Sequence, residues 1–458
     1  MLRNNERASL REKICFGVGS ISYCVEMILV LTYLMLFCTD VLMVDVVLIG
    51  GVMTAVKILD AISDIIITNL ADRTNTKWGK YRVWLLCGIP LAIMMFLLFL
   101  NPGFLQTEKA KILWICIIYI LLVPVLETSY TCPYMAMIVT MSEHPKDRLD
   151  FSMARALGEA GAQIIVSLLV MPIILMFGSY RDITGWRVMA GVIGCIIIVT
   201  TLTSFFGTKE RMVVTNQNEN GTQMTFKDKV QVLKGNKPFW KLIGIIVLFM
   251  AHFYASSTLF SFFCIHNLGH EEWVAPLTTI GFALKIVITI LLFYLGRRFE
   301  KRNLLLVVGV CIVLANVLLF FENGFVVAAG YQVLLGIGNG LFNGVAFAAL
   351  PDVTDYTEWK TGKALPGMIS AFATFAMKMG GAGSTLLASF ILSLAKYDAM
   401  IPVQTDSTLL MLRIGIPLNS LIFLGAALIL TGTLKELNQA KLALYRKEID
   451  AKAAKDPV

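Results

Sequence analysis

Three charged side chains and a serine lie close together in an otherwise apolar stretch. Lys57, Asp60 and Asp64 are spaced by three and four residues, and Ser63 directly precedes Asp64. In a helix this spacing places the three charges on one face. Two carboxylates repel each other and one ammonium group neutralises only one of them, so this face can hold a small cation or a proton. The alternative is an ion pair with a purely structural role.

A second polar patch contains Glu127, Thr128 and Thr131, and Pro133-Tyr134 follows it. Glu127 and Thr131 are four residues apart, so they share a helical face. The ring of Pro133 frees a backbone carbonyl one turn earlier, which is typical of a bend beside a cavity. These residues therefore predict the wall of a polar cavity. The alternative is that Glu127 lies near a membrane surface.

Tyr23 and Glu26 lie three residues apart, and Arg155 and Glu159 lie four apart. Glu26 faces the same cavity or pairs with a partner helix such as the one that carries Arg155, and both interpretations stay open. Arg155 and Glu159 can pair with each other. Because arginine presents a fixed fork that grips hydroxyls or a carboxylate, Arg155 is also a candidate substrate ligand.

The second half of the chain carries few charges in its apolar stretches. Lys285 is one, and Lys378 is another, just before two consecutive glycines. A lysine in a closely packed helix must reach a carboxylate, and the candidates are Asp60 and Asp64. His252 lies among aromatic residues and a serine, and we expect it to be packed and hydrogen-bonded rather than a proton relay.

The composition identifies the surroundings of these charges. The 458 residues are 57% hydrophobic and 15% charged, with a mean hydropathy of +0.74. Soluble domains carry about 25% charged residues, so a soluble enzyme or a nucleic-acid-binding protein is excluded. Since a bilayer core needs about 20 apolar residues per helix, we predict twelve spans, at roughly 14–38, 45–70, 82–101, 111–140, 152–177, 186–206, 241–265, 273–296, 303–321, 326–350, 366–395 and 408–432.

The longest polar interval, from Thr208 to Lys237, separates six spans from six. We therefore predict an all-α membrane protein of two six-helix bundles, with an N-terminal bundle at 1–207, a central loop at 208–240, a C-terminal bundle at 241–433 and a tail at 434–458. This predicted arrangement resembles the major facilitator architecture.

The basic residues predict the orientation of the chain. Most of the 39 Lys and Arg residues fall on the side of the termini and the central loop. The positive-inside rule places both termini and that loop in the cytoplasm. From Lys435 to Lys455 the apolar residues have helical spacing, which predicts either a cytoplasmic helix or a solvated charged tail.

Several of these stretches resemble one known family, the glycoside, pentoside and hexuronide cation symporters, which includes the melibiose permease-like carriers of the major facilitator superfamily. The resemblance runs from the first span to the last. It rests on Lys57-Ile-Leu-Asp60-Ala-Ile-Ser-Asp64, on residues 71–84 and 351–362, on Lys378-Met-Gly-Gly381 and on Thr39-Asp40-Val41.

The resemblance implies roles for individual residues. The cation site would draw on Asp60, Ser63, Asp64 and Thr128, and Asp60 and Asp64 would be the metal ligands if the ion is Na⁺. Lys378 would face the same carboxylates, and Arg155 would lie near the sugar. The cytoplasmic gating networks would contain Asp72, Arg73, Arg148, Asp352 and Asp355.

The chain also departs from the family. Cys24 and Thr131 stand where the melibiose carrier has acidic residues, and Met135 stands where it has a stacking tryptophan. Galactoside recognition is therefore not implied, and Glu26 and Glu127 replace the lost carboxylates in our hypothesis. We place Thr131 in both the cation set and the substrate set. The substrate set is Tyr23, Glu26, Glu127, Thr131, Tyr134, Arg155 and Lys378.

The predicted function is secondary active symport of a sugar or glycoside with H⁺ or Na⁺ by alternating access. The missing acid removes an oxygen ligand for sodium, so we favour H⁺. We expect no cofactor beyond the co-transported ion, no nucleic-acid partner, and a functional monomer that spans the cell membrane many times.

Three other functions compete with this prediction. The same fold can carry a lysolipid or another non-sugar polar substrate, and a non-transporting membrane sensor is a further alternative. A sensor would need a soluble signalling domain, and the longest non-membrane stretch is the short central loop. An enzyme would need a metal cluster or a nucleophile with its base. The four histidines form no such pattern.

Overall fold

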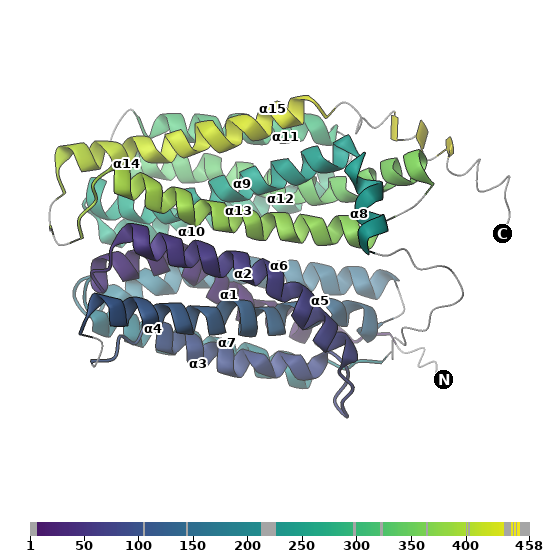
Figure 1. Cartoon of the computed structure of the whole chain (residues 1–458), viewed down its shortest axis with the longest axis horizontal. Coiled ribbons are helices and arrows are strands. Elements are labelled where there is room, and N and C mark those ends of the chain that lie inside the picture. Colours follow the sequence, from purple (N-terminus) through teal and green to yellow (C-terminus); the bar gives the residue numbers. More distant parts are fainter. Residues whose placement is uncertain are drawn as a thin grey trace. The chain divides into compact units, whose positions relative to one another are not determined.

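The structure is a computed structural model of the whole chain (Figure 1). It describes residues 7–103, 106–142, 145–211, 226–295, 299–320, 324–362, 365–399, 401, 404–434, 441–442, 444–445 and 447–448. The regular elements of these residues are helical, apart from one isolated bridge between Thr76 and Gly79. Of the stretch from Lys435 to Lys455, predicted as either a helix or a solvated tail, only 441–442, 444–445 and 447–448 belong to the described residues, and they are helical.

The described chain forms long helices joined by short turns. The α-helices are α1 (Leu10–Leu36), α2 (Val46–Arg73), α3 (Gly88–Leu98), α4 (Glu108–Ile120), α5 (Thr128–Met141), α6 (Pro145–Leu175), α7 (Ile183–Gly207), α8 (Phe226–Lys234), α9 (Lys237–Phe262), α10 (Val274–Leu295), α11 (Lys301–Leu318), α12 (Phe325–Thr361), α13 (Pro366–Leu394), α14 (Asp406–Asn419) and α15 (Gly425–Gly432). Shorter 3₁₀ or π segments are η1 (Phe37–Val41), η2 (Arg82–Cys87), η3 (Leu121–Glu127), η4 (Phe263–Asn267), η5 (Glu271–Trp273) and η6 (Ser420–Leu424).

Eleven helices of the described residues are long and apolar enough to cross a membrane. They match eleven of the twelve predicted spans, and the remaining prediction, 82–101, falls on the shorter apolar helix Arg82–Leu98. The prediction of an all-α membrane protein is therefore confirmed. One span is longer than predicted, because α12 continues through Pro351 to Thr361 and ends at Gly362, whose φ of +69° favours glycine.

The contacts divide the chain into two compact units. Unit 1 contains residues 1–217, 260–279 and 388–409, and unit 2 contains residues 218–259, 280–387 and 410–458. The predicted boundaries of the two bundles, at 207 and 241, stay a prediction.

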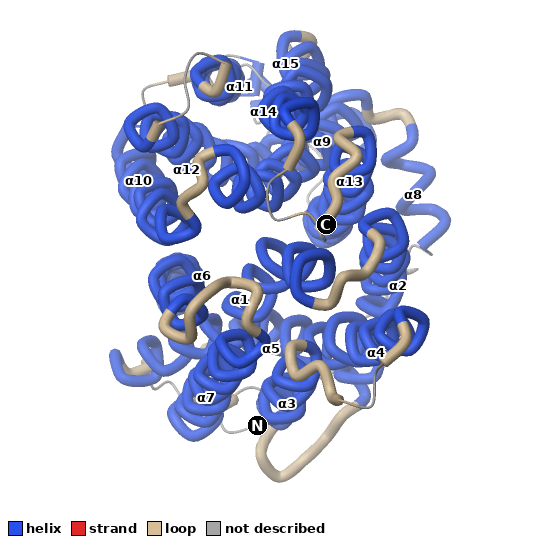
Figure 2. Tube along the Cα trace, turned by 90° about the vertical axis from the view of Figure 1, so that its left-hand side faces the viewer, coloured by secondary structure: helices blue, strands red, loops and turns tan. Residues whose placement is uncertain are grey.

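In unit 1 the first helix packs closely against α6 and α7 (Figure 2). Glycines allow this approach. A Cβ atom on Gly158 of α6 would lie 2.0 Å from the Gly17 carbonyl oxygen and 2.1 Å from Ser20 Oγ. Ser20 Oγ in turn donates to the carbonyl oxygens of Gly17, at 2.7 Å, and Arg155, at 2.9 Å. The glycine thus brings the polar residues of α1 and α6 together.

Replacing this glycine tests the packing. Gly158→Ala is expected to destabilise the protein by about 1–3 kcal/mol, because backbone atoms of α1 must move to make room for the methyl group. Gly161→Ala, one turn further along α6, is the matched control, since a Cβ atom there meets nothing within 4 Å. Thermal unfolding in detergent should show a lower midpoint for the first variant only. Equal midpoints would contradict the packing.

In unit 2 helices α11 and α12 form the largest contact between two helices. A Cβ atom on Gly338 would lie 2.4 Å from Ile312 Cγ1, so the two helices approach closely at this glycine. The sequence prediction missed α8, which lies in the predicted central loop. The following turn is anchored by Asn236, whose side-chain amide donates to Thr357 Oγ1 of α12 at 2.7 Å.

Candidate functional site

Three of the five predicted cation residues meet at one buried point in unit 1. Thr128 Oγ1, at the start of α5, donates to Asp60 Oδ1 of α2 at 2.9 Å and lies 3.4 Å from Ser63 Oγ. Ser63 Oγ also donates to the Asp60 carbonyl oxygen at 2.8 Å. The side chains of Asp60 and Thr128 are buried. The arrangement therefore offers a carboxylate and two hydroxyls to a cation or proton.

The other two predicted cation residues point to different partners. Cys132 Sγ donates to Asp64 Oδ1 at 3.6 Å, so Asp64 meets a sulfur atom of α5 there. The Thr131 hydroxyl donates to the carbonyl oxygen of Glu127 on its own helix. Thr131 therefore uses its proton within the fourth span, and the described contacts do not bring it to Asp60.

The helix that carries Glu127 and Thr128 is irregular at this point. Residues Leu121–Glu127 form a π segment, η3, which contains Pro124, and regular α-helix resumes at Thr128. The predicted bend lay at Pro133, whereas Pro133 lies inside the regular helix α5. Proline removes a hydrogen bond from the helical ladder, and π segments are frequent at functional sites. The irregularity thus directly precedes the residue that meets Asp60.

Glu26 belongs to a buried group of charges beside Asp60. Electrostatic interactions join Glu26 to Glu127, Lys57 and Asp60, and Tyr119 also interacts with Lys57. Glu26 is fully buried, and neither of its carboxylate oxygens has a hydrogen-bond partner in the part of the chain that the structure describes. Glu26 thus has electrostatic partners on α2 and in η3, and whether it faces a substrate cavity stays a prediction.

Arg155 and Glu159 of α6 form the ion pair that their spacing predicts. Tyr23 of α1 donates from its hydroxyl to the same Glu159 oxygen, Oε1. The side chains of Arg155 and Glu159 keep 27% and 29% of their surface exposed. Tyr134 lies nearby but is fully buried, stacks on Phe16 and donates to the Phe16 carbonyl oxygen at 2.6 Å.

The predicted gating residues of unit 2 lie at the end of α12. Asp352 is buried and accepts a hydrogen bond from Lys301 Nζ at 2.6 Å. Lys301 begins α11 and belongs to the basic stretch between the predicted spans 273–296 and 303–321. Asp355 lies one turn further along α12 and is half-buried. The contact between Asp352 and Lys301 joins α12 to α11, and the gating role of Asp352 stays a prediction.

The predicted gating residues of unit 1 lie at the ends of helices. Arg148 Nε, near the start of α6, donates to the carbonyl oxygen of Ser142, the residue that caps α5, at 2.8 Å. Arg73 ends α2 and is exposed, and the side chain of Asp72 lies outside the described residues. Sequence reasoning missed Glu210, which accepts hydrogen bonds from backbone N–H groups at the start of η2, among them that of Tyr81 at 2.8 Å.

Sequence reasoning also missed Asp147. Its carboxylate accepts hydrogen bonds from Lys13 Nζ at 2.8 Å, and from the Ala8 N–H and the Ser142 hydroxyl at 3.1 Å each. Burial raises the pKa of Asp147, but these hydrogen-bond partners lower it by more, so the pKa falls to about 2. The carboxylate therefore ties the start of α1 to the start of α6.

The Asp147 contacts predict a pH-dependent stability. Because the folded-state pKa lies below the usual value, this contribution is fully present above about pH 4 and is lost as the pH falls towards 2. Asp147→Asn is expected to destabilise the protein by about 1–3 kcal/mol at pH 7 and by progressively less below pH 4. Asp406→Asn, at an exposed position that starts α14, is the control. Thermal unfolding across pH checks this, and a difference that does not depend on pH would contradict it.

The three polar residues that the sequence singled out in the apolar stretches of unit 2 have different surroundings. His252 is buried, and its Nδ1 lies 3.3 Å from Ser256 Oγ and 3.2 Å from Ser420 Oγ, so it is packed and hydrogen-bonded as expected. Lys285 Nζ lies 5.4 Å from the centre of the Phe253 ring. Lys378 lies on α13, where the adjoining glycine Gly380 approaches Val247 of α9. That Lys378 faces Asp60 and Asp64 stays a prediction.

Asp40, at the end of the first span, belongs to a polar cluster whose contacts the sequence did not predict. Tyr397 donates to both oxygens of Asp40 at 2.6 Å, and His266 Nε2 lies 2.9 Å from the Tyr397 hydroxyl. Tyr180 also donates to Asp40, at 3.1 Å. Burial and the Asp40 carboxylate raise the pKa of Tyr397, so its hydroxyl remains a donor at neutral pH. The cluster ties η1 to segments that come much later in the chain.

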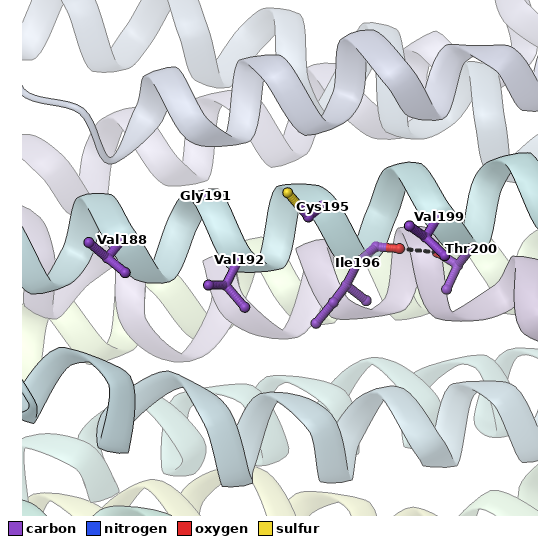
Figure 3. Close-up of a pocket in the computed structure, with 7 residues that line it drawn as sticks. All are labelled: Val188, Gly191, Val192, Cys195, Ile196, Val199 and Thr200. Carbon is purple, nitrogen blue, oxygen red and sulfur yellow. Dashed lines mark hydrogen bonds between the residues drawn. The ribbon is translucent and has the colours of Figure 1, made fainter.

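A shallow depression on α7 is chemically different from these clusters (Figure 3). Apart from Thr200, its lining is apolar or sulfur-bearing, and Thr200 Oγ1 donates to the carbonyl oxygen of Ile196 at 2.7 Å. Val199 and Val192 are exposed there. An apolar helix surface is the expected contact with lipid, so we place the candidate site at the buried charges and not in this depression.

Known proteins resemble the chain over almost its whole length. The family described as MFS/sugar transport protein matches residues 15–435. The isoprimeverose transporter of Lactiplantibacillus pentosus is 26% identical, over 85% of this chain and 81% of the relative. The inner membrane symporter YicJ of Escherichia coli (strain K12) is also 26% identical, over 88% and 87%.

The fold has solved counterparts as well. The crystal structure of a bacterial homologue of the human lysosomal transporter Spinster, in an inward-facing and unoccupied conformation, matches with a TM-score of 0.68. The two sequences are 15% identical, and the match covers 95% of this chain and 99% of the Spinster homologue. At this identity the match supports the fold alone. The match of the family over residues 15–435 decides the identity: the chain belongs to the MFS/sugar transport protein family.

Proposed function

We propose that this transporter carries a sugar or glycoside across the cell membrane by alternating access, together with H⁺ as the coupling ion. The observation that carries the proposal is the contact between Asp60 and Thr128, with Glu26, Lys57 and Glu127 in electrostatic reach. A charge inside the bilayer costs at least about 2.5–3.5 kcal/mol, so a group of charges there needs a function or a close set of partners.

The choice of ion follows from the oxygen atoms around Asp60. Hard cations such as Na⁺ favour several oxygen ligands. Ser63 and Thr128 offer hydroxyls, but Asp64 meets the Cys132 sulfur and Thr131 donates to a backbone carbonyl. A single proton on a carboxylate needs no such cage, so this arrangement favours H⁺. Sodium coupling is the competing outcome in the experiments below.

The sugar site in this proposal lies where the first span contacts α6. Tyr23, Arg155 and Glu159 offer hydroxyl, guanidinium and carboxylate groups, which are the usual partners of sugar hydroxyls. Of these groups, Tyr23 shares α1 with Glu26, and Arg155 and Glu159 lie on α6. The first helix therefore links the sugar residues to the charges around Asp60, and this link is how ion binding and sugar binding influence each other in our proposal.

The remaining parts of the proposal concern orientation and gating. Most of the 39 Lys and Arg residues fall on the side of the chain that carries both termini and the central loop. By the positive-inside rule, this side faces the cytoplasm. The contact between Asp352 and Lys301 belongs to a cytoplasmic gate that opens and closes with the transport cycle. A functional monomer suffices for this mechanism, since both sites lie within one chain.

A counterflow screen tests the proposal. Purified protein in proteoliposomes is loaded with an unlabelled glycoside, pentoside or uronide, and entry of the same labelled compound is followed at several pH values with and without sodium. We expect exchange of at least one sugar, with pH dependence and no requirement for sodium. Exchange that needs sodium at every pH would overturn the choice of H⁺. Exchange of no sugar in the panel would overturn the proposed substrate class.

A further inference from the structure

The arginine at the proposed sugar site already has an anionic partner. Arg155 pairs with Glu159 one turn later on α6, and the Tyr23 hydroxyl donates to the same carboxylate oxygen. Both charged side chains keep more than a quarter of their surface exposed, so a ligand can reach them. The unpaired guanidinium that an anionic ligand would require is therefore not present at this point of the structure.

The buried lysine of unit 1 is engaged by acids as well. Lys57 interacts electrostatically with three carboxylates, those of Glu127, Asp60 and Glu26. In unit 2, Lys285 lies over the Phe253 ring, and Lys378 also has interactions of its own. An anion that enters next to Arg155 thus meets the negative charge of Glu159, and unit 1 offers no surplus positive charge among its described buried groups.

A neutral sugar meets a different situation. The contacts of Glu159 with Arg155 and Tyr23 both use Oε1, which leaves Oε2 to accept a hydrogen bond from a sugar hydroxyl. Arginine has five N–H donors, and the contact with Glu159 uses one nitrogen, so further donors remain for sugar oxygens. The pair can therefore bind hydroxyls from both sides without giving up its own ion pair.

We propose that Glu159 is a specificity residue that makes this site select uncharged glycosides and reject uronides. The proposal rests on the proposed function and narrows its substrate class. The family that the sequence resembles takes both glycosides and hexuronides, so the distinction matters. A uronide carboxylate beside Glu159 adds like-charge repulsion and must compete with Glu159 for Arg155, whereas removal of the Glu159 charge frees the guanidinium.

Matched pairs of sugars test the proposal. Counterflow in proteoliposomes is measured for methyl glucoside and methyl glucuronide, for methyl galactoside and methyl galacturonide, and for methyl xyloside as the pentoside. In the first two pairs only the group at carbon 6 changes, from CH₂OH to a carboxylate. The wild-type protein should exchange at least one neutral sugar, and it should favour the neutral member of a pair by at least about tenfold.

Three variants separate charge from structure. Glu159→Gln should shift the ratio of uronide to neutral exchange towards the uronide by at least about tenfold, because Arg155 loses its partner. Glu159→Asp keeps the charge and should keep the preference for neutral sugars. Glu108→Gln makes the same chemical change at an exposed position and should leave the ratio unchanged. Thermal unfolding of each variant checks that it is folded.

The possible results point to different conclusions. A wild-type protein that exchanges a uronide as well as its neutral partner overturns this proposal but leaves sugar transport in place. A ratio that stays the same in folded Glu159→Gln overturns it too. If Glu159→Gln does not fold, the wild-type comparison still decides. A wild-type protein that exchanges none of the five sugars, although it is folded, counts against the proposed function and removes the basis of this inference.

Discussion

Asp60→Asn is expected to abolish the accumulation of substrate against its gradient and to reduce the ratio of internal to external sugar to about one. Asparagine keeps the shape of the side chain and can still accept a hydrogen bond from Thr128, which lies 2.9 Å from Asp60 Oδ1. It cannot bind and release a proton, and it has no charge for a cation. The ion gradient can then no longer drive sugar uptake, while exchange of sugar by counterflow remains measurable.

The control for this variant is Asp182→Asn. Asp182 is exposed and accepts a hydrogen bond from the Thr184 N–H at the start of α7, a role that asparagine fills equally well. Both variants are compared in gradient-driven uptake and in counterflow. An Asp60→Asn protein that still concentrates sugar as well as the Asp182→Asn protein would show that Asp60 does not couple the ion.

Arg155→Ala should have the second large effect, a loss of at least about thirtyfold in the rate of sugar exchange. The substitution removes the donors of the proposed sugar site and leaves the Glu159 carboxylate without its ion-pair partner. Removing one partner of a hydrogen-bonded charge pair leaves the other charge uncompensated, and a loss of about 2 kcal/mol corresponds to about thirtyfold in binding. Arg155→Lys keeps the charge without the planar fork, so its rate of sugar exchange should lie between the rates of the wild type and of Arg155→Ala.

Initial rates of counterflow over a range of sugar concentrations separate the possible causes. We expect a raised half-saturation concentration for Arg155→Lys and little measurable exchange for Arg155→Ala, at unfolding midpoints within a few degrees of the wild type. Arg187→Ala serves as a comparison, because Arg187 also binds through its guanidinium, to the carbonyl oxygens of Leu100 and Asn101. Normal exchange by a folded Arg155→Ala protein would remove Arg155 from the sugar site.

The membrane spans were predictable because their signal is local. A helix must satisfy its backbone hydrogen bonds inside the bilayer, so about 20 apolar residues in a row suffice to identify it. The pair of Arg155 and Glu159 was predictable for the same reason, since residues four apart share a helical face. The exact end of α12 was not predictable, because Pro351 does not end this helix and it continues to the glycine Gly362.

Contacts between distant segments were not predictable from spacing. Asp40 meets Tyr180, His266 and Tyr397, which come from three later parts of the chain, and no local pattern connects them. The partnership of Asp147 with Lys13 has the same character. The irregular segment η3 was missed because the sequence offers two prolines in the fourth span, and the packing around them decides which one disrupts the helix.

The buried charges lie between these two cases. The spacing of Lys57 and Asp60 correctly placed them near each other, and the resemblance supplied Thr128 as a partner for Asp60. The partners of Glu26 stayed open in the sequence, and in the structure it interacts electrostatically with Glu127 and Lys57. A single charge on an apolar helix has many possible partners, and only the packing of the neighbouring helices selects one.

Sugar-driven proton movement tests the central claim most directly. Proteoliposomes that contain a pH-sensitive dye are prepared without any ion gradient, with valinomycin and potassium to dissipate the membrane potential, and a sugar found in the counterflow screen is added outside. Because coupling is reciprocal, sugar that enters with H⁺ should acidify the lumen, and Asp60→Asn should remove this signal. Entry of labelled sugar through the wild-type protein with no change in luminal pH would contradict proton-coupled symport.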